Sequence, residues 1–212
     1  MMDFLSSLRT QAWRTAGARY NAARRLRRRE FFSTVSLAIF SALSVAIAFV
    51  QRIYTSQQGT ALDNYLTALL VGLGVFLLAI SLMEWGARNG AQADALHRNA
   101  EELTGFQLKV GQRIAELHSG AQGSWQVVES LRVEYEDIKR RCQYNHEPLD
   151  DKKFRASKRT EVEFSGSNGA PSMGRCCAIW TELRWFLASV WYFGLLWLVV
   201  VGALLMSFWV PR

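Results

Sequence analysis

Three uncharged apolar stretches dominate the hydrophobic pattern of the chain. They run from Phe31 to Val50, from Tyr65 to Met83 and from Trp185 to Val210. At a helical rise of about 1.5 Å per residue, each is long enough to cross the roughly 30 Å hydrocarbon core of a bilayer. The pattern therefore predicts an all-α membrane protein, with a two-helix transmembrane hairpin (31–50 and 65–83) and a third transmembrane helix in the C-terminal segment 180–212.

The segment 84–149, between the second and third spans, has a helical repeat instead of a continuous apolar run. Apolar residues recur there in steps of three and four, the spacing of a heptad seam. The first seam consists of Leu96, Ala100, Leu103, Val110, Ile114 and Leu117, with an interruption at Gln107, and the second of Val128, Leu131, Tyr135, Ile138 and Cys142. Between them, "HSGAQGS" predicts a loop and Ser124 a helix cap. We expect a cytoplasmic antiparallel helical hairpin whose first helix continues the second span.

Two polar segments flank these elements. Residues 1–30 are predicted to form a basic N-terminal helix. Residues 150–179 carry mixed charge followed by Ser, Gly and Pro, a composition typical of a flexible linker. Beyond the linker, Trp180, Trp185 and Trp209 are expected to anchor the third span at the membrane interface.

The charge distribution predicts the orientation of the spans, because lysine and arginine near a span stay on the cytoplasmic side. Residues 1–30 contain eight arginines against two acidic residues, a net charge of +6, whereas residues 51–64 and 84–184 are each balanced. We therefore expect the N-terminus and residues 84–184 in the cytoplasm, and the 51–64 loop and the C-terminus outside. Orientation and anionic lipid explain the cluster "RRLRRRE" (24–30), so no nucleic acid is expected as a partner. The 30 residues before the first span are too long for the start of a signal peptide, although "AIA" (46–48) resembles a cleavage site.

Candidate catalytic and metal-binding groups are sparse. The spans contain no Asp, Glu, Lys, Arg or His, which disfavours a proton relay or an ion-coupled transport site. The three histidines, His97, His118 and His146, are far apart in the sequence, and the three cysteines lack the spacing of a zinc site. We therefore expect no enzymatic activity, no metal and no cofactor.

Hydroxyl groups gather on one side of the first predicted span. On a helical wheel of 100° per residue, Ser33, Ser36, Ser41, Ser44 and Gln51 fall within an arc of about 140°. The alanines at 38, 42 and 46 form a small-residue stripe on the opposite side. The hydroxyl face has two interpretations, close packing between helices and the lining of a pore in an oligomer. Both predict helix association, and only the second predicts conduction.

Motifs at the two ends of the helical hairpin carry a family resemblance. The helix that leaves the membrane contains "ALHRNAEEL" (95–103), and the hairpin ends with Tyr135, Ile138, Asn145, His146 and Asp150. This arrangement, over about residues 10–155, resembles the SLATT family of bacterial two-span effectors, to which the third span is an addition.

The resemblance implies a homo-oligomeric effector that permeabilises the bacterial inner membrane in anti-phage or other conflict systems. Its implied partners are the lipid bilayer and a nucleotide-signalling or sensor protein. The candidate signal-coupling residues are then His97, Tyr135, Asn145, His146 and Asp150.

Two functions remain open at this point. The first is a pore-forming membrane effector gated by a partner or a nucleotide signal. The second is a non-conducting scaffold that recruits a cytoplasmic partner through the helical hairpin. His146 is expected to end the second hairpin helix, since a cation near a helix C-terminus and a following Pro148 are both typical of helix ends.

Overall fold

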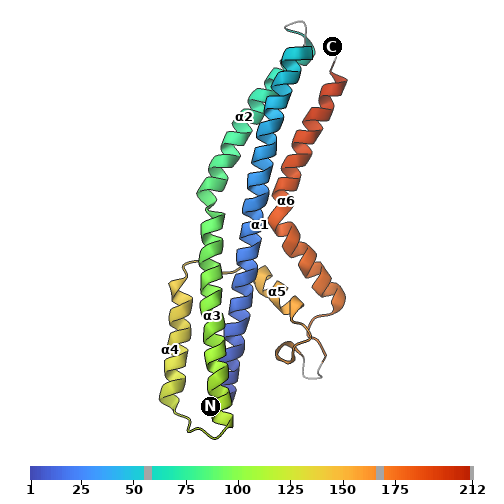
Figure 1. Cartoon of the computed structure of the whole chain (residues 1–212). Helices are drawn as coiled ribbons and strands as arrows, with labels where there is room; N and C mark the ends of the chain where they lie inside the picture. Colours follow the sequence, from blue (N-terminus) through green and yellow to red (C-terminus); the bar gives the residue numbers. More distant parts are fainter. Residues whose placement is uncertain (55–58, 166–169, 211–212) are drawn as a thin grey trace. The chain divides into compact units, whose positions relative to one another are not determined.

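The computed structural model describes residues 1–54, 59–165 and 170–210 (Figure 1). Within these residues the chain is almost entirely helical and has no β-strand, only an isolated bridge between Ser165 and Pro171. The helices are α1 (Met2–Tyr54), α2 (Ala61–Ala87), α3 (Asn89–His118), α4 (Trp125–Arg141), α5 (Pro148–Ser157) and α6 (Arg175–Met206), with two short 3-10 helices, η1 (Val162–Phe164) and η2 (Ser207–Trp209). The predicted all-α class is confirmed.

The chain divides into two compact units. Unit 1 contains residues 1–27 and 90–188, and unit 2 contains residues 28–89 and 189–212. Helices α1 and α6 contribute residues to both units.

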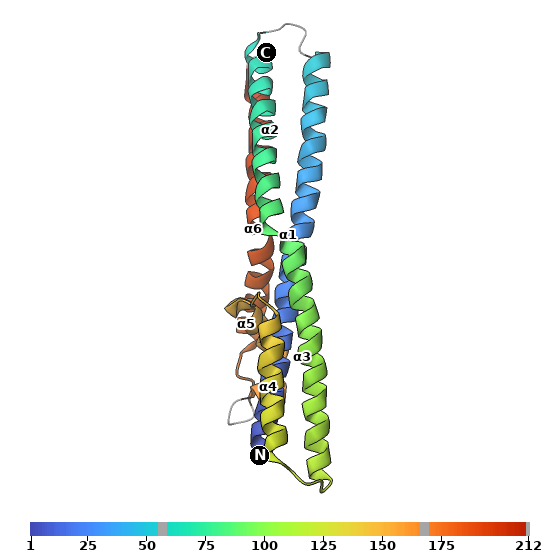
Figure 2. The ribbon, with the colours of Figure 1, turned by 90° about the vertical axis from the view of Figure 1, so that its left-hand side faces the viewer.

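Unit 1 has a core formed by α3, α4 and the N-terminal part of α1 (Figure 2). Its buried residues are Leu5, Leu8, Ala12 and Ala16 from α1, Leu103, Phe106 and Val110 from α3, and Val128, Leu131, Tyr135 and Ile138 from α4. Most of the α3 and α4 residues are predicted seam positions, so the helical hairpin is confirmed. The side chain of Ser124 accepts a hydrogen bond from the N–H of Gln126 at 3.2 Å and caps α4, as expected. The basic N-terminal helix is an integral part of this core, which charge alone did not predict.

The start of segment 150–179, which we expected to be a flexible linker, is helical in the structure. Residues Pro148–Ser157 form α5, because Pro148 occupies the first turn, where its missing N–H is not needed. The Asp150 carboxylate accepts the N–H of the N-cap residue Glu147 at 3.0 Å. On the other side of α5, Phe154 is buried and meets the ring of Trp13 edge-on at 5.5 Å. Packing of Phe154 therefore orders a segment whose charges resemble those of a linker. Residues 166–169 of the predicted linker lie outside the described residues.

Unit 2 contains the three apolar stretches. Their core consists of Phe40 from α1, Leu73 and Ile80 from α2, and Phe193, Leu196 and Val200 from α6. Two polar contacts tie α6 to its neighbours: the hydroxyl of Tyr65 donates to the carbonyl of Ala203 at 2.6 Å, and the indole of Trp197 donates to Ser36 Oγ at 3.0 Å. In the part of the chain that the structure describes, three helices are long and apolar enough to cross a membrane, which fits a multi-pass membrane protein.

The junction between the second span and the hairpin is a single residue. Helix α2 ends at Ala87, α3 begins at Asn89, and Arg88 between them has the left-handed backbone conformation, with φ of 49°. The first hairpin helix therefore follows the second span directly in sequence, as expected, but with a break at Arg88.

Candidate functional site: a buried aspartate and an adjoining pocket

The carboxylate of Asp150 is completely buried in unit 1 and receives four hydrogen bonds. Its Oδ1 accepts from Arg25 Nε at 3.1 Å and from the indole of Trp185 at 2.9 Å. Its Oδ2 accepts from Arg25 Nη2 at 3.1 Å and from the N–H of Glu147 at 3.0 Å. A carboxylate offers about four acceptor positions, so Asp150 is fully satisfied as an ionised group. One side chain thereby joins α1, the start of α5 and α6.

Arg25 is the positive partner at this site. Its guanidinium binds both Asp150 oxygens and also lies 2.9 Å from Glu147 Oε1. Burial lowers the pKa of Arg25, but the hydrogen bonds and charges of Asp150 and then of Glu147 outweigh burial and raise it above its ordinary value. Four residues before Arg25 in α1, the side-chain amide of Asn21 donates to the Asp150 carbonyl at 3.1 Å. The two residues attach α1 to the N-terminal turn of α5.

Trp185 is a structural partner of Asp150 and not the membrane-interface anchor that we expected. Only 5% of its surface is exposed, and its indole N–H donates a hydrogen bond to the Asp150 carboxylate. The ammonium of Lys153 lies 5.4 Å from the indole ring and also pairs with Glu182. Helix α6 is therefore held to α5 through its first turns by charge, cation–π and hydrogen-bond contacts.

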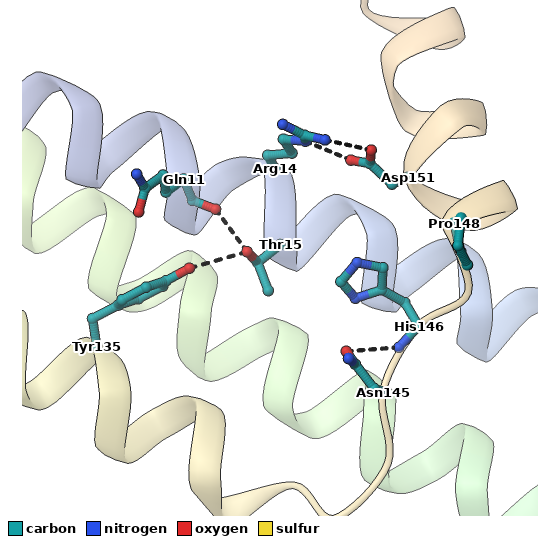
Figure 3. Close-up of a pocket in the computed structure, with 8 residues that line it drawn as sticks. All are labelled: Gln11, Arg14, Thr15, Tyr135, Asn145, His146, Pro148 and Asp151. Carbon is teal, nitrogen blue, oxygen red and sulfur yellow. Dashed lines mark hydrogen bonds and ion pairs between the residues drawn. The ribbon is translucent and has the colours of Figure 1, made fainter.

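A pocket of about 430 Å³ lies beside the aspartate, between α1, α4 and the loop that precedes α5 (Figure 3). It is lined by Gln11, Arg14, Thr15, Tyr135, Asn145, His146, Pro148 and Asp151. The Tyr135 and Thr15 hydroxyls are hydrogen-bonded at 3.1 Å, and Asn145 Oδ1 accepts the backbone N–H of His146 at 3.0 Å. The structure thus brings three of the predicted signal-coupling residues to one pocket.

Arg14 and Asp151 close one side of the pocket as a bidentate ion pair, with both N–O distances at 2.6 Å (Figure 3). The hydrogen bond to Asp151 raises the pKa of Arg14 more than burial lowers it. This wall is therefore close to neutral, and the remaining lining offers hydroxyl, amide and imidazole groups.

His146 is the titratable group of the pocket. Its Nδ1 is buried and, in the described part of the chain, has no hydrogen-bond partner. Burial lowers the pKa of the imidazole, and the positive charge of Arg19 lowers it further. The carboxylates of Asp151 and Asp150 oppose this change without reversing it. His146 does not end α4, which stops at Arg141; it lies in the loop before α5.

His97 lies apart from the pocket. It belongs to α3, where Nε2 is 3.5 Å from Glu101, and its ring meets that of Tyr20 edge-on at 5.2 Å. The structure therefore does not unite His97 with the other signal-coupling candidates. Among residues 1–54, 59–165 and 170–210, no group of three or more His, Cys, Asp or Glu is arranged to hold a metal ion.

Comparison with known proteins places this architecture in a family. The family model of SMODS and SLOG-associating 2TM effector domain family 5 (SLATT_5) matches residues 1–206. The chain belongs to this family. No curated protein and no solved structure is detectably similar to it. The SLATT_5 match extends past the range of about 10–155 that carries the sequence resemblance, and it takes in α6. Membership indicates a membrane effector of conflict systems, in an effector-domain family that is not a known enzyme family.

The hydroxyl face predicted for the first span is divided in this SLATT_5 chain. Ser33 and Ser36 are buried, and Ser36 accepts the indole N–H of Trp197. Gln51 donates to Asp63 Oδ1 and to Thr67 Oγ1, each at 2.8 Å, and so connects the end of α1 to the start of α2. These three residues are engaged in contacts within the chain.

The other two serines are more accessible. Ser44 is half-buried and donates to the carbonyl of Phe40 at 2.9 Å, whereas Ser41 is exposed and donates to the carbonyl of Leu37 at 2.8 Å. Such bonds to the preceding turn satisfy a hydroxyl in an apolar environment. The residues at 38, 42 and 46, on the opposite stripe, are all exposed.

Sequence analysis did not identify Arg14, Arg25 or Trp185 as members of the site. Arg25 belongs to the cluster at 24–30, which orientation explained, Arg14 contributed only to the basic excess of residues 1–30, and Trp185 stands at the edge of an apolar stretch. A signal was present nonetheless. The spacing of Glu147, Pro148 and Asp150 is that of a helix N-terminus, which would have placed Asp150 on a structured element.

Proposed function

We propose that the protein oligomerises in the bacterial inner membrane and permeabilises it when unit 1 receives a signal from a partner protein or a nucleotide. The proposal places the N-terminus and residues 84–184 in the cytoplasm, as the basic excess of residues 1–30 favours. The observation that carries it is that α1 leaves both its alanine stripe and, on the hydroxyl side, Ser41 uncovered by the chain itself.

A pore would have to form between copies and not within one chain. The interior of unit 2 is filled by the side chains of Phe40, Phe193 and their neighbours. Only 22%, 17% and 22% of the three apolar windows are buried within the chain, which leaves most of each span for lipid or other copies. Alanine at 38, 42 and 46 permits close approach of a second helix, because small side chains allow backbones to pack tightly in a membrane.

Ser41 is the strongest candidate for the lining of such a pore. Ser33 is buried, and Ser36 and Gln51 have hydrogen-bond partners within the chain, whereas the exposed side chain of Ser41 is available to water if copies surround a channel. We propose that Ser41, with Ser44 one turn away, lines the pore and that the buried Ser36 holds α6 against α1 through Trp197.

The pocket around His146 is the proposed point where the signal acts. Its volume of about 430 Å³ lies within the range of small-ligand sites. Its wall includes residues on both sides of Pro148, so occupation of the pocket would displace the start of α5. Because Asp150 joins α5 to Trp185 of α6, such a displacement would be passed to the helix that continues into the third span.

The test is membrane depolarisation and dye entry in bacteria that express the full chain with its gene neighbours under activating conditions. Ser41→Leu should abolish depolarisation. Val50→Leu, an apolar enlargement at another exposed position on the opposite side of α1, should leave it unchanged.

The competing function, a non-conducting scaffold, gives a different result. If the membrane stays polarised in every condition while the protein is inserted and oligomeric, pore formation is refuted and partner recruitment through the helical hairpin replaces it. Equal loss of activity in Ser41→Leu and Val50→Leu would instead refute the role of the serine as lining.

A further inference from the structure

Helix α6 is longer than a membrane span requires. The helix runs from Arg175 to Met206, and η2 extends it to Trp209. Residues 189–209 alone reach about 31 Å at 1.5 Å per residue, which covers the hydrocarbon core. Residues 175–188 belong to unit 1 and need another explanation.

This segment has two distinct faces. One face is buried in unit 1 and consists of Ala178, Thr181 and Trp185, with exposed fractions of 9%, 7% and 5%. The opposite face is apolar and exposed: it consists of Cys176, Ile179, Trp180, Leu183, Phe186 and Leu187. On a helical wheel these six residues cover an arc of about 120°, the width of the apolar stripe that a surface helix normally buries.

We propose that this exposed face of residues 175–188 lies in the surface of the bilayer, among the lipid headgroups and the first carbons of the acyl chains. Residues 175–188 precede the third span in the same helix, so the exposed face begins where the chain enters the membrane. Trp, Phe, Leu and Ile are the side chains with which in-plane amphipathic helices enter this region.

Charge at the edges of the face fits the same partner. Arg175 and Arg184 lie just outside the apolar arc, one on each side, and both are exposed. Basic residues in this position attract the anionic lipids of a cytoplasmic leaflet. The acidic residue of the segment, Glu182, lies about 40° outside the arc on the side of Arg175, and its charge is paired with Lys153 of α5. The face therefore combines apolar contact with a basic rim.

The inference does not rest on pore formation, because a non-conducting scaffold would use the same face. It assigns to unit 1 a contact with lipid that is separate from the spans. The helix that makes this contact is also the one that Asp150 holds through Trp185.

Two adjacent native cysteines allow a direct test. Cys176 lies within the apolar arc, whereas Cys177 is exposed about 100° further round the helix and outside it. Full-length protein that retains one of them, with the other cysteines replaced by serine, would be labelled with the environment-sensitive dye NBD and reconstituted into vesicles of phosphatidylethanolamine and phosphatidylglycerol.

The label on Cys176 should emit at shorter wavelength than the label on Cys177 and be several-fold less quenched by aqueous iodide. A nitroxide near the lipid headgroup should quench it more than a nitroxide deep in the acyl chain. Iodide should quench the label on Cys176 more strongly in vesicles of phosphatidylcholine alone than in the vesicles that contain phosphatidylglycerol. This difference between the two kinds of vesicle should shrink in R175Q/R184Q.

Three outcomes would overturn the proposal. Equal iodide quenching of the two labels would mean that the face is in water. Protection of Cys176 without quenching by the headgroup nitroxide would mean that protein covers it. Protection that disappears as the protein-to-lipid ratio falls would assign the face to a second copy of the chain.

Discussion

Replacing Asp150 with asparagine should destabilise unit 1 strongly, because the substitution keeps the shape of the side chain and removes its charge. The Asn carbonyl can still accept from Arg25 Nε and Trp185, but its NH₂ group would face two donors, Arg25 Nη2 and the N–H of Glu147. Removing one partner of a buried ion pair costs about 3–5 kcal/mol. The Glu147 carboxylate remains 2.9 Å from Arg25 and still compensates part of the arginine's charge. We therefore expect the free energy of unfolding to fall by about 3 kcal/mol, at the lower end of that range.

The assay is reversible chemical denaturation of the full chain in detergent micelles. Asp94→Asn is the matched control. Asp94 of α3 pairs at 2.9 Å with Arg27, which lies in α1 like Arg25, but both side chains of this pair are about half exposed. The control should be hard to distinguish from the unmutated protein. A double-mutant cycle with Arg25→Gln should give a coupling energy of about 0.5–3 kcal/mol. A loss below about 1 kcal/mol in Asp150→Asn, or no coupling to Arg25, would refute the buried ion pair as the link between the helices.

Two further predictions concern the surroundings of the same site. The lowered pKa of His146 means that the unfolded chain binds its proton first, so stability should be full above about pH 6.5 and fall as pH drops through the lowered value. Thermal unfolding of His146→Gln between pH 7.5 and 5 should lack this decline, whereas the exposed His118→Gln should keep it; an unchanged decline in His146→Gln would contradict the assignment. Gly17→Ala should lower the free energy of unfolding by about 1–3 kcal/mol, since the new methyl would clash with the Phe154 ring. Gly105→Ala on α3, where the new methyl meets open space, should not destabilise the protein. Equal effects of the two substitutions in denaturation would refute the close packing of α5 on α1.

Much of the fold was predictable because its determinants are local. Charge-free runs identify spans without any knowledge of tertiary contacts, and heptad spacing identified the seams of α3 and α4. The same spacing was also present in α1 at Leu5, Leu8, Ala12 and Ala16, but eight arginines in residues 1–30 concealed it. A helix that carries an orientation signal can supply a core face as well, since the two use different sides of it.

The site was only partly predictable, because its contacts join positions far apart in the chain. Tyr135, Asn145 and His146 were identified and do line one pocket. The partners of Asp150 are 125 and 35 residues away, and no pattern in sequence pairs one aspartate with one arginine among eight. α5 was missed for a related reason: one buried aromatic residue and one buried carboxylate order a segment that is otherwise charged.

The arginines of α1 have acidic partners that all follow α1 in the chain. Five of the eight form ion pairs with acidic residues that occur later in the chain: Arg9 with Glu163, Arg14 with Asp151, Arg25 with Asp150 and Glu147, Arg27 with Asp94, and Arg29 with Glu84. These carboxylates all follow the first span in the chain, so the arginines carry their full charge until the later segments fold against α1. Later they are neutralised in the fold. If the basic excess orients the spans, as we propose, the same residues serve both topology and the stability of the fold, and a charge-reversed acidic partner should impair folding without inverting the spans.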